Sequence, residues 1–182
     1  YQHGRYLIPV VPVLLIWGLA GTAALVGGKP PGRLRWMVGR VWVAVIGLLL
    51  VLFWWLGLDA FTKDVAVING EMVATANWLV RNTKPDELIA AHDIGAIGFF
   101  TEREIVDLAG LISPDVIPFI RDESQLIDYL NQECPVYLVT FPDWYPEIVT
   151  GRQMVFQTDT AITREFGEEN MAVYLWETCT GD

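Results

Sequence analysis

The sequence predicts a hairpin of two membrane-spanning helices followed by an extracytoplasmic α/β domain with a mixed, partly parallel sheet. Three observations predict it: two long uncharged runs, an uneven distribution of charge, and alternating helix-like and strand-like segments after residue 62. Residues 1–61 hold five basic residues and one acidic residue, a net charge of +4, whereas residues 62–182 hold seven basic and 21 acidic residues, a net charge of −14. This contrast indicates two environments and therefore two domains, 1–61 and 62–182.

Two uncharged runs are long enough to cross a bilayer. Residues 6–28 would form a helix of about 34 Å, and residues 41–58 one of about 27 Å, against a hydrocarbon core of about 30 Å. Pro9 and Pro12 fall in the first turns of the first span, where a missing N–H costs least. A signal peptide and a pair of buried soluble helices are the alternatives. The length of the first run and the presence of a second favour two spans.

The segment between the spans, KPPGRLRWMVGR, carries four cations and no acid. Short basic loops stay in the cytoplasm, so both the N-terminus and everything after residue 60 should lie outside. The prediction is therefore a multi-pass cell-membrane protein with membrane lipid as a partner. The acidic domain has a net charge of −14 and no basic cluster that would neutralise phosphates, so we expect no nucleic acid as a partner.

The acidic domain should open with an amphipathic helix, because apolar residues recur at helical spacing over 63–83. Strand-like runs follow at 87–93, 103–111, 135–141, 154–159 and 171–178, the last two as an antiparallel edge. Between them we expect a helix over 113–120 with Ser113 as its N-cap, and a helix over 122–133 with Asp122 and Gln125 as a capping box. Residues 142–149 are expected to form a loop or a short helix.

His92 and Asp93 end the first predicted strand, where open α/β sheets place ligands. Gly95 and Gly98 follow, but the glycine pattern of a dinucleotide site is incomplete. A local hydrogen bond within a turn is the alternative explanation of the His–Asp pair.

Three further groups have a possible function and a simpler alternative. Asp107 and Asp115 could coordinate a cation, or each could cap a helix or lie in a solvated turn. Trp144 or Tyr145 could stack a sugar, or could pack on the membrane or the core. The two cysteines, Cys134 and Cys179, could pair or remain separate thiols, and no metal-binding spacing is present. We therefore predict no metal and no cofactor.

His3 and Arg5 stand immediately before the first span. Arginine can grip phosphate oxygens with two hydrogen bonds, and histidine can donate a further one. At the outer boundary of the bilayer, the available phosphate belongs to a lipid. A plain anchor that fixes the depth of the helix is the alternative.

Two stretches, HGRYLIPVVP and HDIGAIGFFTEREIVDLAGLISPDVI, resemble the C-terminal part of bacterial GT-C class membrane glycosyltransferases, the relatives of protein mannosyltransferases and aminoarabinose lipid A transferases. The resemblance covers roughly residues 1–120. It implies inverting transfer of a hexose or pentose from a polyprenyl-phosphate donor outside the cell membrane. It also implies that His3, Arg5 and Tyr6 lie near the donor phosphate, and that preceding spans of the same polypeptide carry the catalytic carboxylate. No catalytic residue is therefore assigned to this chain.

Two other functions stay open. One is a non-catalytic, membrane-anchored extracytoplasmic module that binds a glycan or assists assembly. The other is an outer-surface hydrolase that uses His92 and Asp93, although no Ser or Cys nucleophile stands in a recognisable motif.

Overall fold

The computed structural model describes residues 5–27, 32–165, 167 and 169–177. It divides into two compact units, Tyr1–Ala60 and Phe61–Asp182, and each is described by itself.

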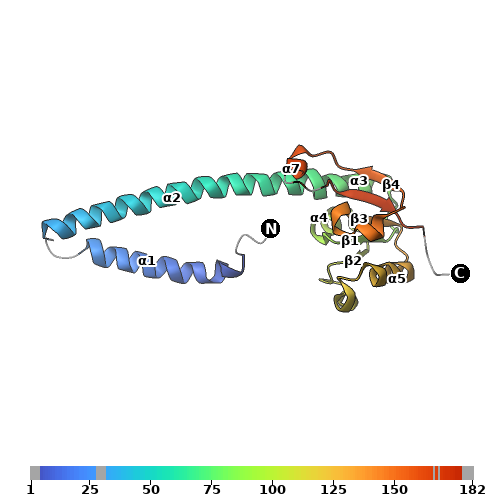
Figure 1. Cartoon of the computed structure of the whole chain (residues 1–182), viewed down its shortest axis with the longest axis horizontal. Helices are drawn as coiled ribbons and strands as arrows, with labels where there is room; N and C mark the ends of the chain where they lie inside the picture. The colour runs from blue at the N-terminus through green and yellow to red at the C-terminus, as the bar shows by residue number, and fades with distance from the viewer. Residues whose placement is uncertain (1–4, 28–31, 166, 168, 178–182) are drawn as a thin grey trace. The chain divides into compact units, whose positions relative to one another are not determined.

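The first unit contains two long apolar helices (Figure 1). A 3-10 turn, η1 (Arg5–Val10), leads into α1 (Val11–Val26), and α2 (Arg33–Val67) follows. Within the described residues, these are the helices whose length and composition would allow them to cross a membrane. α2 begins eight residues before the predicted second span. The basic residues Arg33, Arg35 and Arg40 consequently lie on the helix itself and not in a loop.

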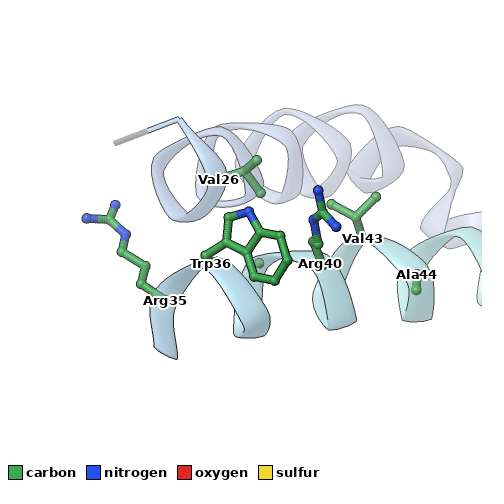
Figure 2. Close-up of a pocket in the computed structure, with 7 residues that line it drawn as sticks. Val26, Arg35, Trp36, Arg40, Val43 and Ala44 are labelled. Atoms are coloured by element: carbon green, nitrogen blue, oxygen red, sulfur yellow. The ribbon is translucent and has the colours of Figure 1, made fainter. Parts of the chain in front are cut away.

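The two helices pack where α1 ends and α2 begins (Figure 2). Gly39 is the buried residue of α2, and a Cβ placed on it would lie 3.7 Å from Cγ2 of Val26. Nη2 of Arg35 donates to the carbonyl oxygen of Ala24 at 2.8 Å, which satisfies a carbonyl in the last turn of α1. The small side chain of Gly39 thus permits close approach, and a charged side chain caps the neighbouring helix.

The second unit begins at Phe61, within the residues of α2. α2 passes into a π-helical segment, η2 (Ile68–Val73), and then into α3 (Ala74–Asn82). The helix predicted over 63–83 is confirmed, but its buried face begins later than the apolar spacing indicated. Ile68 is exposed, whereas Ala76 and Leu79 are buried.

A five-stranded mixed sheet forms the centre of this unit, in the order β2-β1-β3-β5-β4. β1 pairs in parallel with β2 and β3, and β5 pairs antiparallel with β3 and β4. The predicted partly parallel sheet and its antiparallel last pair are therefore confirmed. The strands are β1 (Ile89–Ala91), β2 (Ile105–Asp107), β3 (Tyr137–Thr140), β4 (Met154–Gln157) and β5 (Ala172–Leu175).

Each face of the sheet has its own apolar core. Because side chains alternate along a strand, Ala90 of β1 packs into the core formed with α5, while Ile89 and Ala91 pack into the core formed with α3 and α4. Helices consequently cover both faces (Figure 1). The remaining helical segments are α4 (Ile94–Thr101), η3 (Pro114–Phe119), α5 (Glu123–Glu133), η4 (Pro142–Trp144), α6 (Pro146–Val149) and α7 (Ala161–Glu165).

One helix start is as predicted and one is not. Asp122 caps α5 and accepts a hydrogen bond from the N–H of Gln125 at 3.1 Å. The reciprocal bond of the capping box is missing because the N–H of Asp122 already donates to Phe119. The predicted N-cap role of Ser113 is wrong: η3 is a 3-10 turn, and the Ser113 hydroxyl accepts from the N–H of Asp107 at 3.2 Å instead. Pro118 within that segment cannot donate the bond that an α-helix needs.

Cys134 follows α5 in a left-handed conformation and is disulfide-bonded. The other cysteine of the sequence, Cys179, lies outside the described residues. The alternative in which Cys134 is a separate thiol is therefore wrong.

Candidate ligand site at the carboxyl edge of the sheet

The topological switch point of the sheet lies between β1 and β3, because the strands that follow β1 in the chain are added first on one side of it and then on the other. From β1 the chain passes through α4 to β2 on one side, and it then crosses through α5 to β3 on the other. In open α/β sheets the crevice outside the carboxyl ends of two such strands is where ligands bind. The residues that follow β1 and β3 are therefore the first place to look for a site.

His92 follows β1, and Tyr145 lies in the segment that follows β3. Nδ1 of His92 lies 2.6 Å from the hydroxyl oxygen of Tyr145, a hydrogen bond that joins the two strand ends. The edge of the His92 ring also meets Trp144, with ring centroids 4.9 Å apart. Tyr145 is 5% exposed and belongs to the core, whereas Trp144 is 38% exposed. Of the two predicted sugar-stacking candidates, Trp144 is thus the accessible one.

Asp93 occupies the position before α4, but its side chain makes no capping hydrogen bond. Its Oδ2 atom is buried and has no hydrogen-bond partner among the described residues. Burial raises the pKa of this carboxyl, and the nearby His92 offsets part of that effect. A buried oxygen that lacks a donor costs free energy, and a ligand hydroxyl or amine could satisfy it.

The electrostatic surroundings of the site are acidic. Burial, and after it the carboxylates of Glu123, Asp107 and Asp93, raise the pKa of Tyr145 to about 12. Tyr145 is therefore a neutral phenol at physiological pH. A negative environment opposes anionic ligands, so the geometry suits a neutral polyhydroxylated ligand or a cationic one.

Asp107 has a structural function that the sequence did not reveal. It is fully buried, and its carboxylate accepts hydrogen bonds from the N–H groups of Ala109 at 2.7 Å, Ile112 at 2.8 Å, and Leu111. It closes the loop after β2, so the expectation of a solvated turn is wrong, because the carboxylate is inside the domain. Asp115 lies exposed in η3. Within the described residues, no cluster of His, Cys, Asp or Glu could hold a metal ion.

The other predicted site residues belong to the first unit. His3 lies outside the described residues, and Arg5 and Tyr6 begin η1 without described side chains. The structure thus brings His92 together with Trp144 and Tyr145, and Asp93 close enough to Tyr145 to affect its pKa.

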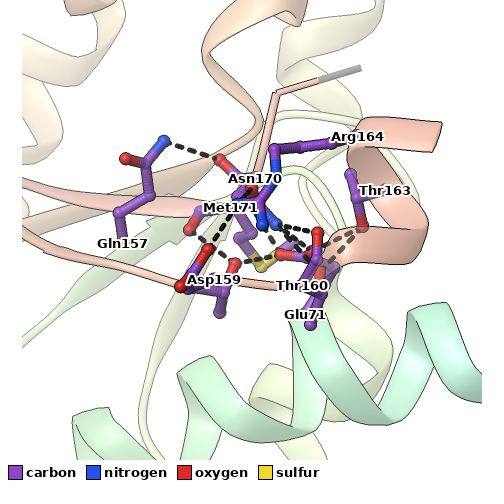
Figure 3. A network of polar contacts seen from close by, with 9 residues as sticks. Glu71, Gln157, Asp159, Thr160, Thr163, Arg164, Asn170 and Met171 are labelled. Carbon is purple, nitrogen blue, oxygen red and sulfur yellow. Dashed lines mark hydrogen bonds and ion pairs between the residues drawn. The ribbon is translucent and has the colours of Figure 1, made fainter. Parts of the chain in front are cut away.

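Sequence reasoning missed Glu71, which is fully buried in the π-helical segment η2 (Figure 3). Five donors surround its carboxylate: the hydroxyls of Thr158, Thr160 and Thr163, the amide of Asn170 and the N–H of Met171. This network, the Glu71 network, fastens the segment between β4 and β5 to the helix. The sequence does show a glutamate between the apolar positions Ile68 and Met72. A single charged residue there does not alter the helical pattern, so the pattern gave no reason to expect it to be buried.

These features define a class: a mixed α/β domain, with a candidate ligand site at its switch point, that continues from a pair of long apolar helices. A family model matches residues 63–175, and the chain belongs to that family, described as Domain of unknown function (DUF8728). Neither the search of curated proteins nor the search of solved structures found a match. The matched range contains every residue of the candidate ligand site and of the Glu71 network.

Proposed function

We propose that this chain is the C-terminal part of an integral-membrane glycosyltransferase, which moves a sugar from a polyprenyl-phosphate donor to an extracytoplasmic acceptor. In this proposal the α/β domain holds the carbohydrate acceptor at the site formed by His92, Asp93 and Trp144. The observation that carries it is the buried, unsatisfied Oδ2 of Asp93 at the switch point, beside His92, whose ring meets the accessible indole of Trp144. A sugar supplies hydroxyl donors for the oxygen and an apolar ring face for the indole.

The membrane part of the proposal rests on the two helices. Leu7–Ala24 and a stretch of Arg33–Asn82 are long and apolar enough to span, and the side chains of those stretches are not buried in the protein. Exposed apolar side chains along two whole helices would be costly in water and are favourable in lipid. The basic residues where α2 begins support a cytoplasmic turn and an extracytoplasmic domain.

The disulfide at Cys134 supports the same orientation. Disulfides persist in oxidising compartments and are rare in the cytoplasm. This observation is independent of hydropathy and of the positive residues.

The donor side of the reaction involves the segment that enters the first span. The acceptor hydroxyl oxygen attacks the anomeric carbon, and the bond from that carbon to the phosphate oxygen breaks. The electron pair stays on polyprenyl phosphate, while the hydroxyl proton passes to a carboxylate in the preceding part of the polypeptide. Arg5, with His3 and Tyr6 nearby, stabilises the charge that develops on the leaving phosphate.

The test is a transfer assay with the polypeptide that contains this chain, in lipid vesicles with polyprenyl-phosphate-linked hexose or pentose. Arg5→Ala should weaken use of the donor more than His92→Ala does. Asp93→Ala and Trp144→Ala should raise KM for the acceptor, while Asp128→Asn, an exposed change on α5, should leave it unaltered. Full activity of Arg5→Ala and of Asp93→Ala would contradict the proposal.

A second candidate is a membrane-anchored binding or assembly module without catalysis. The family match favours it in one respect, because it covers the α/β domain and leaves out α1 and most of α2. A module would bind a glycan with the same Asp93 and Trp144 dependence but would support no transfer in the assay above.

A further inference from the structure

A pocket of about 390 Å³ lies between α1 and α2 (Figure 2). Its lining consists of Val26, Arg35, Trp36, Gly39, Arg40, Val43 and Ala44. Trp36, Arg40 and Val43 recur at helical spacing and therefore lie on the face of α2 that meets α1. The volume is at the lower end for small-molecule sites and suits a headgroup better than a whole lipid.

Arg40 is the central polar group of this pocket. Its guanidinium lies 3.9 Å from the ring centroid of Trp36, a cation–π contact that holds the guanidinium group in place. Among the described residues, no group accepts a hydrogen bond from Arg40, and no acidic side chain lines the pocket. A positioned guanidinium without a counter-ion is a binding group for a planar or tetrahedral oxyanion.

The other residues that line the pocket indicate that this oxyanion belongs to a lipid. Arg35 adds a second positive charge beside the carbonyl of Ala24, and Val26, Val43 and Ala44 supply an apolar wall. Positive charge next to an apolar wall at one end of a helix hairpin matches a phosphate that carries a hydrocarbon tail. Basic pockets between membrane helices on the cytoplasmic side bind lipid headgroups in this way.

We infer that the pocket between α1 and α2 binds the phosphate of an anionic phospholipid from the cytoplasmic leaflet, through Arg40 stacked on Trp36. This inference rests on the membrane placement in the proposed function, and it adds a site on the opposite side of the bilayer from the sugar donor. A lipid there would tie the helix hairpin to the cytoplasmic boundary of the membrane.

Native mass spectrometry of the chain released from detergent tests the site. Phosphatidylglycerol should remain bound at least ~10-fold more strongly than phosphatidylcholine, because both lipids carry the phosphate but the choline cation of phosphatidylcholine is repelled by Arg35 and Arg40. Arg40→Ala should reduce retention ~10-fold, a difference equivalent to one charge-assisted hydrogen bond, while Arg33→Ala, which removes an equal charge from the same helix outside the lining, should change it less than about twofold. Gly39→Leu keeps both arginines, adds side-chain volume to the pocket and should reduce retention at least as much as Arg40→Ala does.

Several outcomes overturn the inference. They are equal retention of the two lipids, an equal loss in Arg33→Ala and Arg40→Ala, or undiminished retention in Gly39→Leu. Full competition by inorganic phosphate would assign the pocket to a free anion and exclude the lipid. The measurement does not depend on glycosyl transfer. Selective lipid retention in a protein without transfer activity would therefore contradict the proposed function and still support this site.

Discussion

The hydroxyl oxygen of Tyr145 lies 2.6 Å from Nδ1 of His92, and this contact joins two neighbouring parallel strands through residues 53 positions apart in the sequence. The contact fixes the histidine ring beside Trp144, at the carboxyl edge of the sheet. The geometry of the candidate ligand site therefore depends on a side chain that is itself part of the core.

Tyr145→Phe should keep the fold and lower the free energy of unfolding by about 1 kcal/mol, because it removes one buried hydrogen bond and leaves the ring in place. Urea denaturation measures the change. Tyr137→Phe, at a partly buried tyrosine of β3 whose ring contacts Trp78, serves as the matched control. Equal stability of Tyr145→Phe and wild type would mean that water replaces the lost bond without cost.

The same residue predicts a response to alkaline pH. Burial, followed by the Glu123 carboxylate, raises the pKa of Tyr145 to about 12. The folded state thus holds the phenol proton more tightly than the unfolded state does. This contribution to stability is complete below the ordinary pKa of about 10 and is lost as the pH rises towards about 12. Thermal unfolding between these pH values should show a steeper decline for wild type than for Tyr145→Phe, and parallel curves would refute the assignment.

Asp93→Asn should stabilise the protein at neutral pH. Burial raises the pKa of Asp93, so its contribution to stability is present below the ordinary value of 3.8 and is lost as the pH rises through the folded value. At pH 7 the buried carboxylate is therefore a cost that the amide does not carry. We expect the midpoint of thermal unfolding to rise by a few degrees at pH 7 and to stay unchanged near pH 3.

The control for Asp93→Asn is Asp128→Asn, which changes an exposed aspartate on α5 and should alter neither midpoint. A lower midpoint for Asp93→Asn at pH 7 would show that the carboxylate stabilises the fold. In that case the argument for an unsatisfied acceptor awaiting a ligand would fail.

The fold was predictable where the signal is local. Apolar runs bounded by turn residues marked all five strands, and the aspartate before α5 marked its start. The stretch that forms α4 received no assignment, because Ile94–Thr101 is apolar on every side and contains two glycines, so it has no helical periodicity. The packing of α4 against α3 and the sheet decides its conformation.

The site was predictable only in part, for a related reason. His92 and Asp93 stand beside a strand end and could be identified from that position. Their partners Tyr145 and Trp144 are adjacent to them only after β3 pairs with β1. Glu71 shows the same limit, because its five donors come from residues about 90 to 100 positions further along the chain.

Glu71→Gln should destabilise the second unit, although the two side chains have nearly the same shape. Each carboxylate oxygen accepts a bond from an obligatory nitrogen donor: Oε1 from the Asn170 amide and Oε2 from the Met171 N–H. Glutamine must turn its own NH₂ towards one of them, which leaves a donor facing a donor. We expect a loss of about 2 to 3 kcal/mol, typical of a broken buried bond to a charged group.

Hydrogen exchange locates this effect. In Glu71→Gln the amide of Met171 and the segment between β4 and β5 should exchange faster, while β1 and β2 should stay protected. Glu165→Gln changes an exposed glutamate on α7 of the same segment and should leave exchange as in wild type. Uniform acceleration across the whole sheet would mean that Glu71 supports the entire fold instead of fastening this one segment.

Cys134 should be oxidised in protein isolated from the cell envelope, because the structure has it in a disulfide and the proposed orientation places it in an oxidising compartment. The unfolded chain should react with maleimide at Cys134 only after treatment with reductant. Reduction should also lower the free energy of unfolding by about 2 to 4 kcal/mol. In Cys134→Ser the reductant should have no effect on the unfolding midpoint, since no bond remains to break. Reaction of Cys134 without reductant would place the domain in a reducing compartment, and the extracytoplasmic orientation would then be wrong.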